Sequence, residues 1–375
     1  MNGGVKIGRI FGISIKLHYT WFLIFALLAW SLAIGYFPVQ IEGKTSTIYW
    51  LMGGFASLLL FASVLLHELS HSVIALKNKI KVSSITLFFF GGVAEVSEDA
   101  FSPNKELKIA IAGPIMSMFL ALCFFLLTKI TVSAPNAVFS YLAWVNFLLG
   151  AFNLVPGFPL DGGRVLRAIL WKKWGDLNKA TYFAAEGGKA FGILLIVMGV
   201  LGIFWGKFNL WYVLIGFFIY SIAKNTYKFT IIRSALKDSK VRDVMAKSFK
   251  TLDANSLVKN FDFKKYLKYD QWAYPVALKK KIIGIALQQH IEKAKTTDLK
   301  TKISAVTIPL TKIKSVEADD SCIKAYELMT KQNLELLPVM KNKKVIGVVK
   351  AAMINELFNM AASKIEIENK ARKKR

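Results

Sequence analysis

The chain has 375 residues and a formal net charge of +26, and 54% of its residues are hydrophobic. So apolar a composition excludes an ordinary soluble protein and predicts that the apolar residues are concentrated in membrane spans. The excess of Lys and Arg lies beside apolar segments and in the last third of the chain, which suits an anionic membrane surface and argues against a nucleic-acid partner.

Six long apolar runs predict about six transmembrane helices, because about 20 helical residues are needed to cross the hydrocarbon core of a bilayer. The runs cover residues 19–37, 48–76, 107–130, 137–156, 190–206 and 209–223. Lys and Arg are dense before the first run, between the second and third, between the fourth and fifth, and after the sixth, whereas the other loops carry few. Since Lys and Arg accumulate on the cytoplasmic side of spans, both termini are predicted to be cytoplasmic.

Small β elements are predicted beside the membrane. Residues 81–98, between the second and third runs, are rich in β-branched and aromatic residues and contain a Gly91-Gly92 pair, which predicts strand and turn. Residues 5–17 have the same character.

The second apolar run contains residues suited to metal chemistry. His67-Glu68-Leu69-Ser70-His71 is an H-E-x-x-H motif, whose two histidines project from one face of a helix. Two imidazoles can hold one metal ion, and Glu68 is placed to take a proton from water activated there. Because ionisable residues within a span are costly unless they face a cavity or a metal, a metal site is favoured over a polar cluster that only joins helices.

A carboxylate is the expected third ligand, since a catalytic zinc site has three protein ligands and the chain has only four histidines. The fourth apolar run ends in F-N-L-V-P-G-F-P-L-D-G-G-R, residues 152–164, where prolines and glycines interrupt the helix beside Asp161. Irregular backbone at this depth is tolerated only where protein or water satisfies it, as in a hydrolytic pocket. Asp161 is therefore the predicted ligand, although D-G-G alone is also compatible with an ordinary turn.

With both motifs in place, residues 1–230 resemble the site-2 protease family of intramembrane zinc metalloproteases. The resemblance lies in H-E-L-S-H and N-L-V-P-G-F-P-L-D-G-G-R, and extends to I-S-I-K-L-H-Y-T, F-F-F-G-G-V-A and A-G-P-I-M-S. It implies one Zn²⁺ per chain held by His67, His71 and Asp161, with Glu68 as the catalytic residue. The implied reaction is hydrolysis of peptide bonds within or near a transmembrane segment of a membrane-protein substrate.

The resemblance also implies residues that contact the substrate. Asn153 matches a polar family position associated with the substrate strand or the oxyanion. Gly91 and Gly92 lie in a segment that could pair as an edge strand with unwound substrate, although a simple hairpin turn explains them equally well. Many family members carry Asn where this chain has Ser117, so the resemblance carries no substrate contact over to that residue.

From about Lys237 the composition changes to charged helices that alternate with short β-rich runs, at residues 273–278, 281–285, 337–339 and 345–349. This region resembles a pair of cystathionine-β-synthase-type (CBS) repeats, about 238–297 and 304–360, within a domain of residues 231–363. A basic tail, residues 364–375, follows. The Ser or Thr and the Asp with which intact repeats bind adenine nucleotides are not evident, so homodimerisation or docking is favoured over nucleotide regulation.

Together these features predict a polytopic α-helical protein of a prokaryotic cell membrane, followed by a cytoplasmic α/β CBS-like pair. No cofactor besides zinc is expected. A catalytically silent scaffold or chaperone of the same fold is the alternative function, and the intact set of His67, Glu68, His71 and Asp161 argues against it. A transporter gated by the repeats is less favoured, because no repeated half and no pair of broken helices is present.

Overall fold

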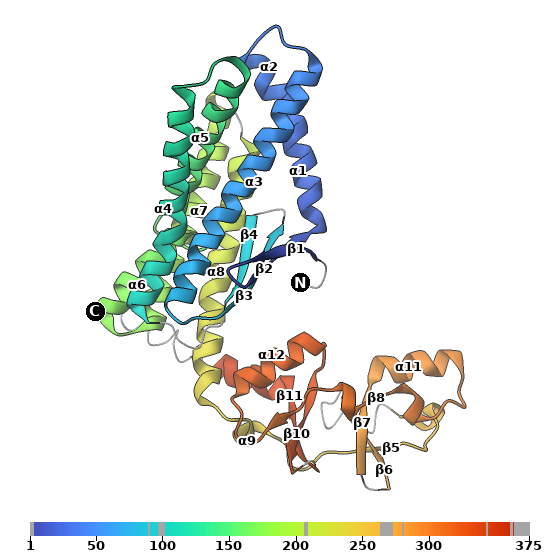
Figure 1. Cartoon of the computed structure of the whole chain (residues 1–375). Helices are drawn as coiled ribbons and strands as arrows, with labels where there is room; N and C mark the ends of the chain where they lie inside the picture. Colours follow the sequence, from blue (N-terminus) through green and yellow to red (C-terminus); the bar gives the residue numbers. More distant parts are fainter. Residues whose placement is uncertain are drawn as a thin grey trace. The chain divides into compact units, whose positions relative to one another are not determined.

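The computed structural model describes residues 4–88, 91–96, 102–205, 209–262, 273–279, 281–342, 344–360 and 363. The chain divides into two compact units, Met1–Tyr227 and Lys228–Arg375. The first is largely helical, with a small sheet, and the second is an α/β structure (Figure 1). The predicted basic tail, residues 364–375, lies outside the described residues.

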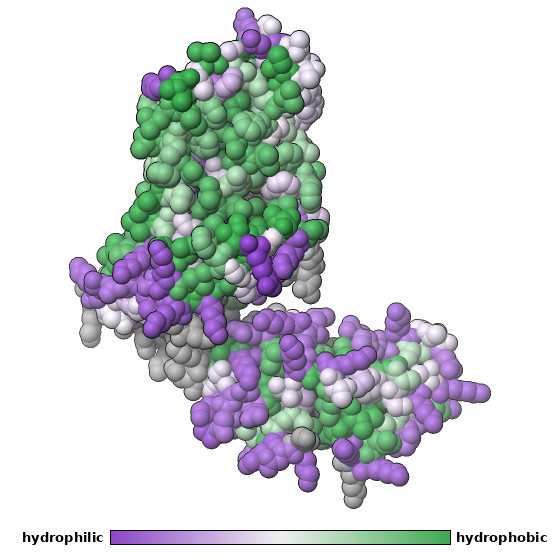
Figure 2. Space-filling model, in the orientation of Figure 1, coloured by the Kyte–Doolittle hydropathy of each residue, from purple (hydrophilic) through white to green (hydrophobic). Residues whose placement is uncertain are grey.

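Among the described residues, five helical segments are long and apolar enough to cross a membrane. The first is Tyr19–Gln40, made of α1 (Tyr19–Ser31), η1 (Leu32–Tyr36) and α2 (Phe37–Gln40). The next three are α3 (Ser46–Lys77), α4 (Pro103–Thr128) and α5 (Ser133–Asn153). The fifth is Leu177–Phe204, which comprises α7 (Leu177–Leu201) and the first residues of η2 (Gly202–Trp205). Apolar residues cover most of the visible face of this unit (Figure 2).

The fifth and sixth predicted runs differ from the helices that contain them. The run at 190–206 overlaps α7 and η2, and α7 begins earlier than the run, at Leu177, so that residues 177–189 are helical despite their charged side chains. The run at 209–223 lies in α8 (Leu210–Asp238), which is not among the five candidate spans. Lys224, Lys228 and Arg233 make the second half of α8 polar.

A short amphipathic helix, α6 (Asp161–Trp174), follows α5 after an irregular segment, residues 154–160. The amide of Phe158 donates to the carbonyl oxygen of Ala184 in α7, at 3.0 Å. A Cβ atom at Gly157 or Gly188 would clash with the backbone facing it, so these glycines let the segment and α7 approach closely. The start of α6, where Asp161 lies, is thus fixed by backbone packing.

The predicted β elements of the first unit form one four-stranded sheet in the order β1-β2-β3-β4. The strands are β1 (Gly4–Ile10), β2 (Ile13–His18), β3 (Val82–Phe88) and β4 (Gly91–Val96). Adjacent strands are antiparallel except for β2 and β3, which are parallel. Ile13, Ile15 and Ile85 are buried in one cluster with Leu69 and Ala75 of α3, so the sheet packs against the helix that carries the histidines.

The second unit contains two small sheets, ordered β5-β6-β7-β8 and β11-β10-β9. The first sheet has β5 (Leu252–Asp253), β6 (Ala273–Leu278), β7 (Lys281–Leu287) and β8 (Thr307–Pro309). The second has β9 (Val316–Glu317), β10 (Leu336–Lys341) and β11 (Lys344–Lys350). The helices are α9 (Val241–Val244), η3 (Val258–Asn260), α11 (Gln288–Thr297), η4 (Ile303–Val306), η5 (Leu310–Lys312) and α12 (Cys322–Gln332). Residues 351–360 are also helical.

The two hairpins of the second unit repeat each other in burial and pairing. Strands β6 and β10 have the same pattern of buried and exposed positions, as do β7 and β11. Each hairpin is antiparallel and has a register shift near its turn. The four predicted β-rich runs of this region are therefore confirmed.

Candidate metal centre

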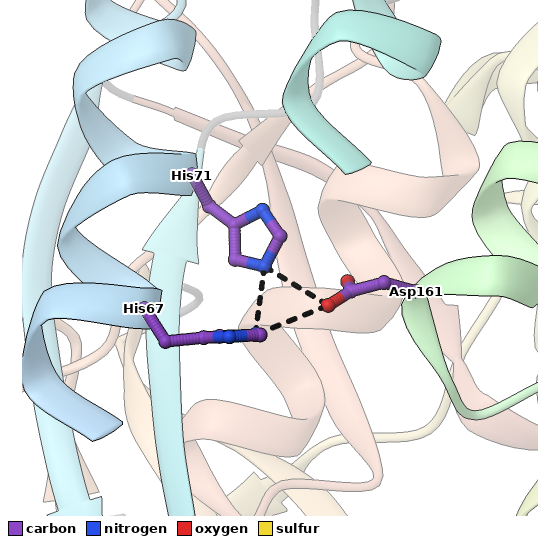
Figure 3. A group of neighbouring side chains, drawn as sticks. All are labelled: His67, His71 and Asp161. Atoms are coloured by element: carbon purple, nitrogen blue, oxygen red, sulfur yellow. Dashed lines mark hydrogen bonds and ion pairs between the residues drawn. The ribbon is translucent and has the colours of Figure 1, made fainter. Parts of the chain in front are cut away.

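Three side chains from two helices meet in the interior of the first unit. His67 and His71 project from one face of α3, and Asp161 faces them from the first turn of α6 (Figure 3). The two histidine side chains are almost fully buried, with exposed residue fractions of 4% for His67 and 6% for His71. Asp161 is also buried, at 9%.

The converging atoms have the spacing of metal ligands. Asp161 Oδ2 lies 3.2 Å from His67 Nε2 and 3.1 Å from His71 Nε2, and the two Nε2 atoms are 3.3 Å apart. Tetrahedral zinc with bonds of about 2.0–2.2 Å separates neighbouring ligand atoms by roughly 3.3–3.6 Å. The observed triangle is at or just below the lower end of that range. Two imidazole nitrogens and one carboxylate oxygen are also the donor types that zinc prefers, so the three residues fit a zinc ion.

The nitrogen of each imidazole that does not face Asp161, Nδ1, is hydrogen-bonded to a residue of α4. His71 Nδ1 lies 2.6 Å from the carbonyl oxygen of Ile109, and His67 Nδ1 lies 2.9 Å from Ser117 Oγ. Each ring therefore turns its Nε2 atom towards Asp161. Metal-binding histidines characteristically have such a partner on the nitrogen that does not bind the metal.

The space for an ion exists because α4 has a glycine facing the histidines. A Cβ atom added at Gly113 would clash with both His71 Nε2 and His67 Nε2. Any other residue at this position would fill the volume into which the ligand atoms point.

The two oxygens of Asp161 face different partners. Oδ2 faces the histidines, whereas Oδ1 lies 3.5 Å from Nη1 of Arg164, one turn along α6. This division leaves one oxygen for a metal, while the guanidinium attracts the other electrostatically.

An ion pair between a buried glutamate and a partly exposed arginine joins α4 to α6. Arg167 of α6 donates to the carboxylate of Glu106, a residue only 1% exposed in the first turn of α4, through Nε at 2.8 Å and also through Nη2. The same guanidinium lies over the ring of Phe158, with its Cζ 5.0 Å from the ring centroid. One arginine thus ties α4, the irregular segment and α6 together.

Glu68 lies next to the first histidine and against the sheet. A Cβ atom at Gly92 of β4 would lie 2.5 Å from Glu68 Cγ, so the absence of a side chain there lets the strand pack on the glutamate. Strand β4 is an edge of its sheet. Gly91 begins the strand with a positive φ of 126°, a conformation that only glycine adopts without strain.

Comparisons with known proteins agree with this chemistry. The family model described as Peptidase family M50 matches residues 55–137 and 128–197. The protein named "Putative zinc metalloprotease sll0528" from Synechocystis is 32% identical over 376 residues, which cover 97% of this chain and 97% of that protein. The chain belongs to peptidase family M50.

Further similarities fit this family. "Zinc metalloprotease MJ0392" of Methanocaldococcus jannaschii is 33% identical over 301 residues, which cover 79% of this chain and 82% of that protein. The solved structure of a site-2 protease from the same organism is 32% identical and covers 60% of this chain and 95% of that one, with a TM-score of 0.42. A CBS domain model matches residues 303–356.

The M50 match confirms the predicted resemblance to the metalloprotease family, and the CBS match confirms the CBS resemblance for residues 303–356, which overlap the second predicted repeat. This M50 peptidase is a zinc metalloprotease and an integral membrane protein. The structure brings together His67, His71 and Asp161 and places Gly92 against Glu68. Asn153 lies at the end of α5, where its amide donates to the carbonyl oxygen of Leu149 in its own helix, at 3.0 Å.

Four residues around the centre were not predicted from the sequence: Ile109, Gly113, Ser117 and Arg164. The first three follow one another at four-residue intervals, which places them on one helical face, and Arg164 is one turn from Asp161. That spacing was visible in the sequence. The sequence did not show which neighbouring helix this face of α4 contacts.

Proposed function

We propose that this M50 peptidase hydrolyses peptide bonds within or near a transmembrane segment of membrane-protein substrates. It uses one zinc ion per chain, held by His67 Nε2, His71 Nε2 and Asp161 Oδ2. The observation that carries this assignment is the triangle of these three atoms, 3.1–3.3 Å on each side, in the interior of an apolar helical unit.

The roles of the chain's own residues follow from their placement. Zinc, when bound, supplies a Lewis acid for water and for the scissile carbonyl. Glu68 takes the proton from the attacking water and returns it to the leaving amine, because its carboxylate belongs to the same helical turn as His67 and His71. The buried walls exclude bulk water, which strengthens every charge interaction in the site.

Substrate must unwind before it can be cut, because peptide bonds within a helix are shielded. We propose that the unwound segment adds as a strand beside β4, an edge of the sheet formed by the described strands, where Gly91 begins the strand and Gly92 lies against Glu68. Asn153 is the proposed polar contact for this strand or for the oxyanion, which requires its amide to leave Leu149 on substrate binding.

The proposed topology has six spans, with α8 as the sixth and both termini in the cytoplasm of a prokaryotic cell. The alternating density of Lys and Arg in the loops supports this orientation. His67 and His71 lie ten and six residues before Lys77, the last residue of α3, so the centre lies roughly 9–15 Å from the cytoplasmic end of that span.

The proposed domain organisation is a protease domain of residues 1–230, a tandem CBS-like domain of residues 231–363 and the basic tail. The repeated burial patterns of the two hairpins support two repeats, about 238–297 and 304–360. We propose homodimerisation or docking as the role of the pair, with adenine-nucleotide regulation as the weaker possibility. Calorimetric titration of the full chain with ATP and AMP separates the two.

Substitution of Glu68 by Gln tests the proposed function. The variant, purified with its zinc, is expected to cleave a model transmembrane substrate in proteoliposomes about 10²–10⁴-fold more slowly, because it keeps the ligands but loses the base. Glu42→Gln, at an exposed loop carboxylate, serves as the control and should cleave at the wild-type rate. Wild-type cleavage by zinc-loaded Glu68→Gln would refute the assignment.

A further inference from the structure

One face of α4 contacts both metal-binding histidines. Ile109, Gly113 and Ser117 recur every four residues, so they lie one above another along the helix. The first supplies a carbonyl oxygen to His71, the second leaves room for the ligand atoms, and the third supplies a hydroxyl to His67. This face of α4 therefore contacts both imidazoles.

The bond from His71 fixes which of its nitrogens is free. The carbonyl oxygen of Ile109 can only accept, so His71 Nδ1 must carry the hydrogen. In the neutral ring, Nε2 then has the lone pair that a metal needs. This constraint comes from the backbone and is independent of the residue type at position 109.

The bond from His67 depends on a side chain. Ser117 Oγ lies 2.9 Å from His67 Nδ1 and can accept the hydrogen that Nδ1 carries when Nε2 binds a metal. Ser117 is fully buried and His67 is 4% exposed, so no bulk water is at hand to replace the hydroxyl. Without the hydroxyl, Nδ1 would have no hydrogen-bond partner and the ring would lose its fixed orientation.

We propose that Ser117 is a positioning residue, which holds the ring of His67 in the orientation that binds zinc and thereby raises the zinc affinity of the centre. Ser117 stands where many family members carry Asn. In this proposal Ser117 acts on the metal ligand His67 and not on the substrate. The inference rests on the proposed function, because it requires His67 to bind zinc.

The experiment measures zinc affinity of the full-length, detergent-purified chain by competition with a chromogenic chelator. Ser117→Ala is expected to weaken zinc binding about 10- to 100-fold, the usual cost of removing a partner of a metal-binding histidine. Ser117→Thr keeps the hydroxyl and should retain most of the affinity. Ser63→Ala is the matched control, since Ser63 is also a buried serine of a candidate span and its hydroxyl bonds no histidine. That hydroxyl donates to the carbonyl oxygen of Leu59 at 2.9 Å and accepts from the amide of Asn146 at 3.3 Å.

The visible spectrum of the cobalt-substituted chain gives a second measurement, which loss of packing alone would not change. Ser117→Ala should shift the ligand-field bands, whereas Ser63→Ala should not. Zinc affinities of Ser117→Ala and wild type within twofold of each other would overturn the inference, as would a Ser117→Thr variant as weak as Ser117→Ala. A wild-type chain that binds no zinc would overturn the proposed function as well, so the two failures are distinguishable.

Discussion

The two units of the chain differ in the polar residues that they bury. Among the described residues, the buried polar and charged side chains all belong to the first unit: Ser57, Ser63, His67, His71, Ser72, Ser84, Glu106, Ser117, Asn146, Asp161 and Thr181. The second unit buries apolar clusters, such as the one around Leu337, Val339 and Val348, and hydrophilic residues gather on its visible face (Figure 2). Most of the large exposed hydrophobic side chains are in the first unit.

The difference follows from the solvent of each surface. A membrane core solvates apolar side chains as well as a protein interior does, so the first unit gains little by burying them and concentrates its polar groups inside. Water favours the reverse arrangement in the second unit. The polar interior of the first unit is also where the proposed metal centre lies, so its buried charges are expected to matter more than the exposed charges of the second unit.

The largest expected effect comes from filling the space between the ligands. Gly113→Ala places a Cβ against both Nε2 atoms and should weaken zinc binding more than about 100-fold. Removal of a residue that only orients a ligand weakens metal binding about 10- to 100-fold, so the expected loss is larger than that. Alanine is a better helix former than glycine by about 1 kcal/mol, so α4 itself should persist. Zinc content of the purified chain measures the effect.

Gly54→Ala is the control for that substitution, because a Cβ atom at this position of α3 would meet nothing within 4 Å. It should bind zinc as the wild type does. Equal zinc affinity of the two alanine variants would contradict the assigned position of the ion.

A smaller effect is expected from the ion pair of Glu106 and Arg167. Glu106→Ala leaves the partly exposed guanidinium of Arg167 without its carboxylate and should destabilise the first unit by about 1–3 kcal/mol. Denaturation in mixed micelles, followed by circular dichroism, measures the loss. Asp319→Ala removes an exposed partner of Arg242 in the second unit and should cost about 0–1 kcal/mol. Similar losses of stability in Glu106→Ala and Asp319→Ala would contradict the expected difference between the two units.

The smallest effect on the metal centre is expected from the core of the second unit. Leu337→Ala should destabilise that unit by about 2–5 kcal/mol, because Leu337 is fully buried in β10, and should leave the zinc content unchanged. Leu299→Ala, at a half-exposed position, should change stability by less than about 0.5 kcal/mol. Urea unfolding with limited proteolysis of the second unit gives both values. Loss of zinc from Leu337→Ala would show that the centre depends on the second unit.

Local pattern in the sequence was enough to predict the apolar helices, the β elements and the three candidate ligands, but not α6 or the start of α7. His67 and His71 share a helical face by their spacing alone, and the prolines and glycines before Asp161 mark the break that exposes it. The pairs of β-rich runs follow from composition and turn residues. Each of these features depends on neighbours within a few residues, so the chain specifies it without knowledge of the fold.

The surroundings of the ligands were decided only by the packing of α3, α4 and α6. The sequence shows Ile109, Gly113 and Ser117 on one helical face but does not show that this face meets the histidines, because the pairing of helices depends on contacts between residues far apart in the chain. The same holds for Glu106 and Arg167, which lie 61 residues apart. The sequence by itself therefore determined which residues can bind zinc, whereas the tertiary structure decided how their side chains are oriented and how much room lies between them.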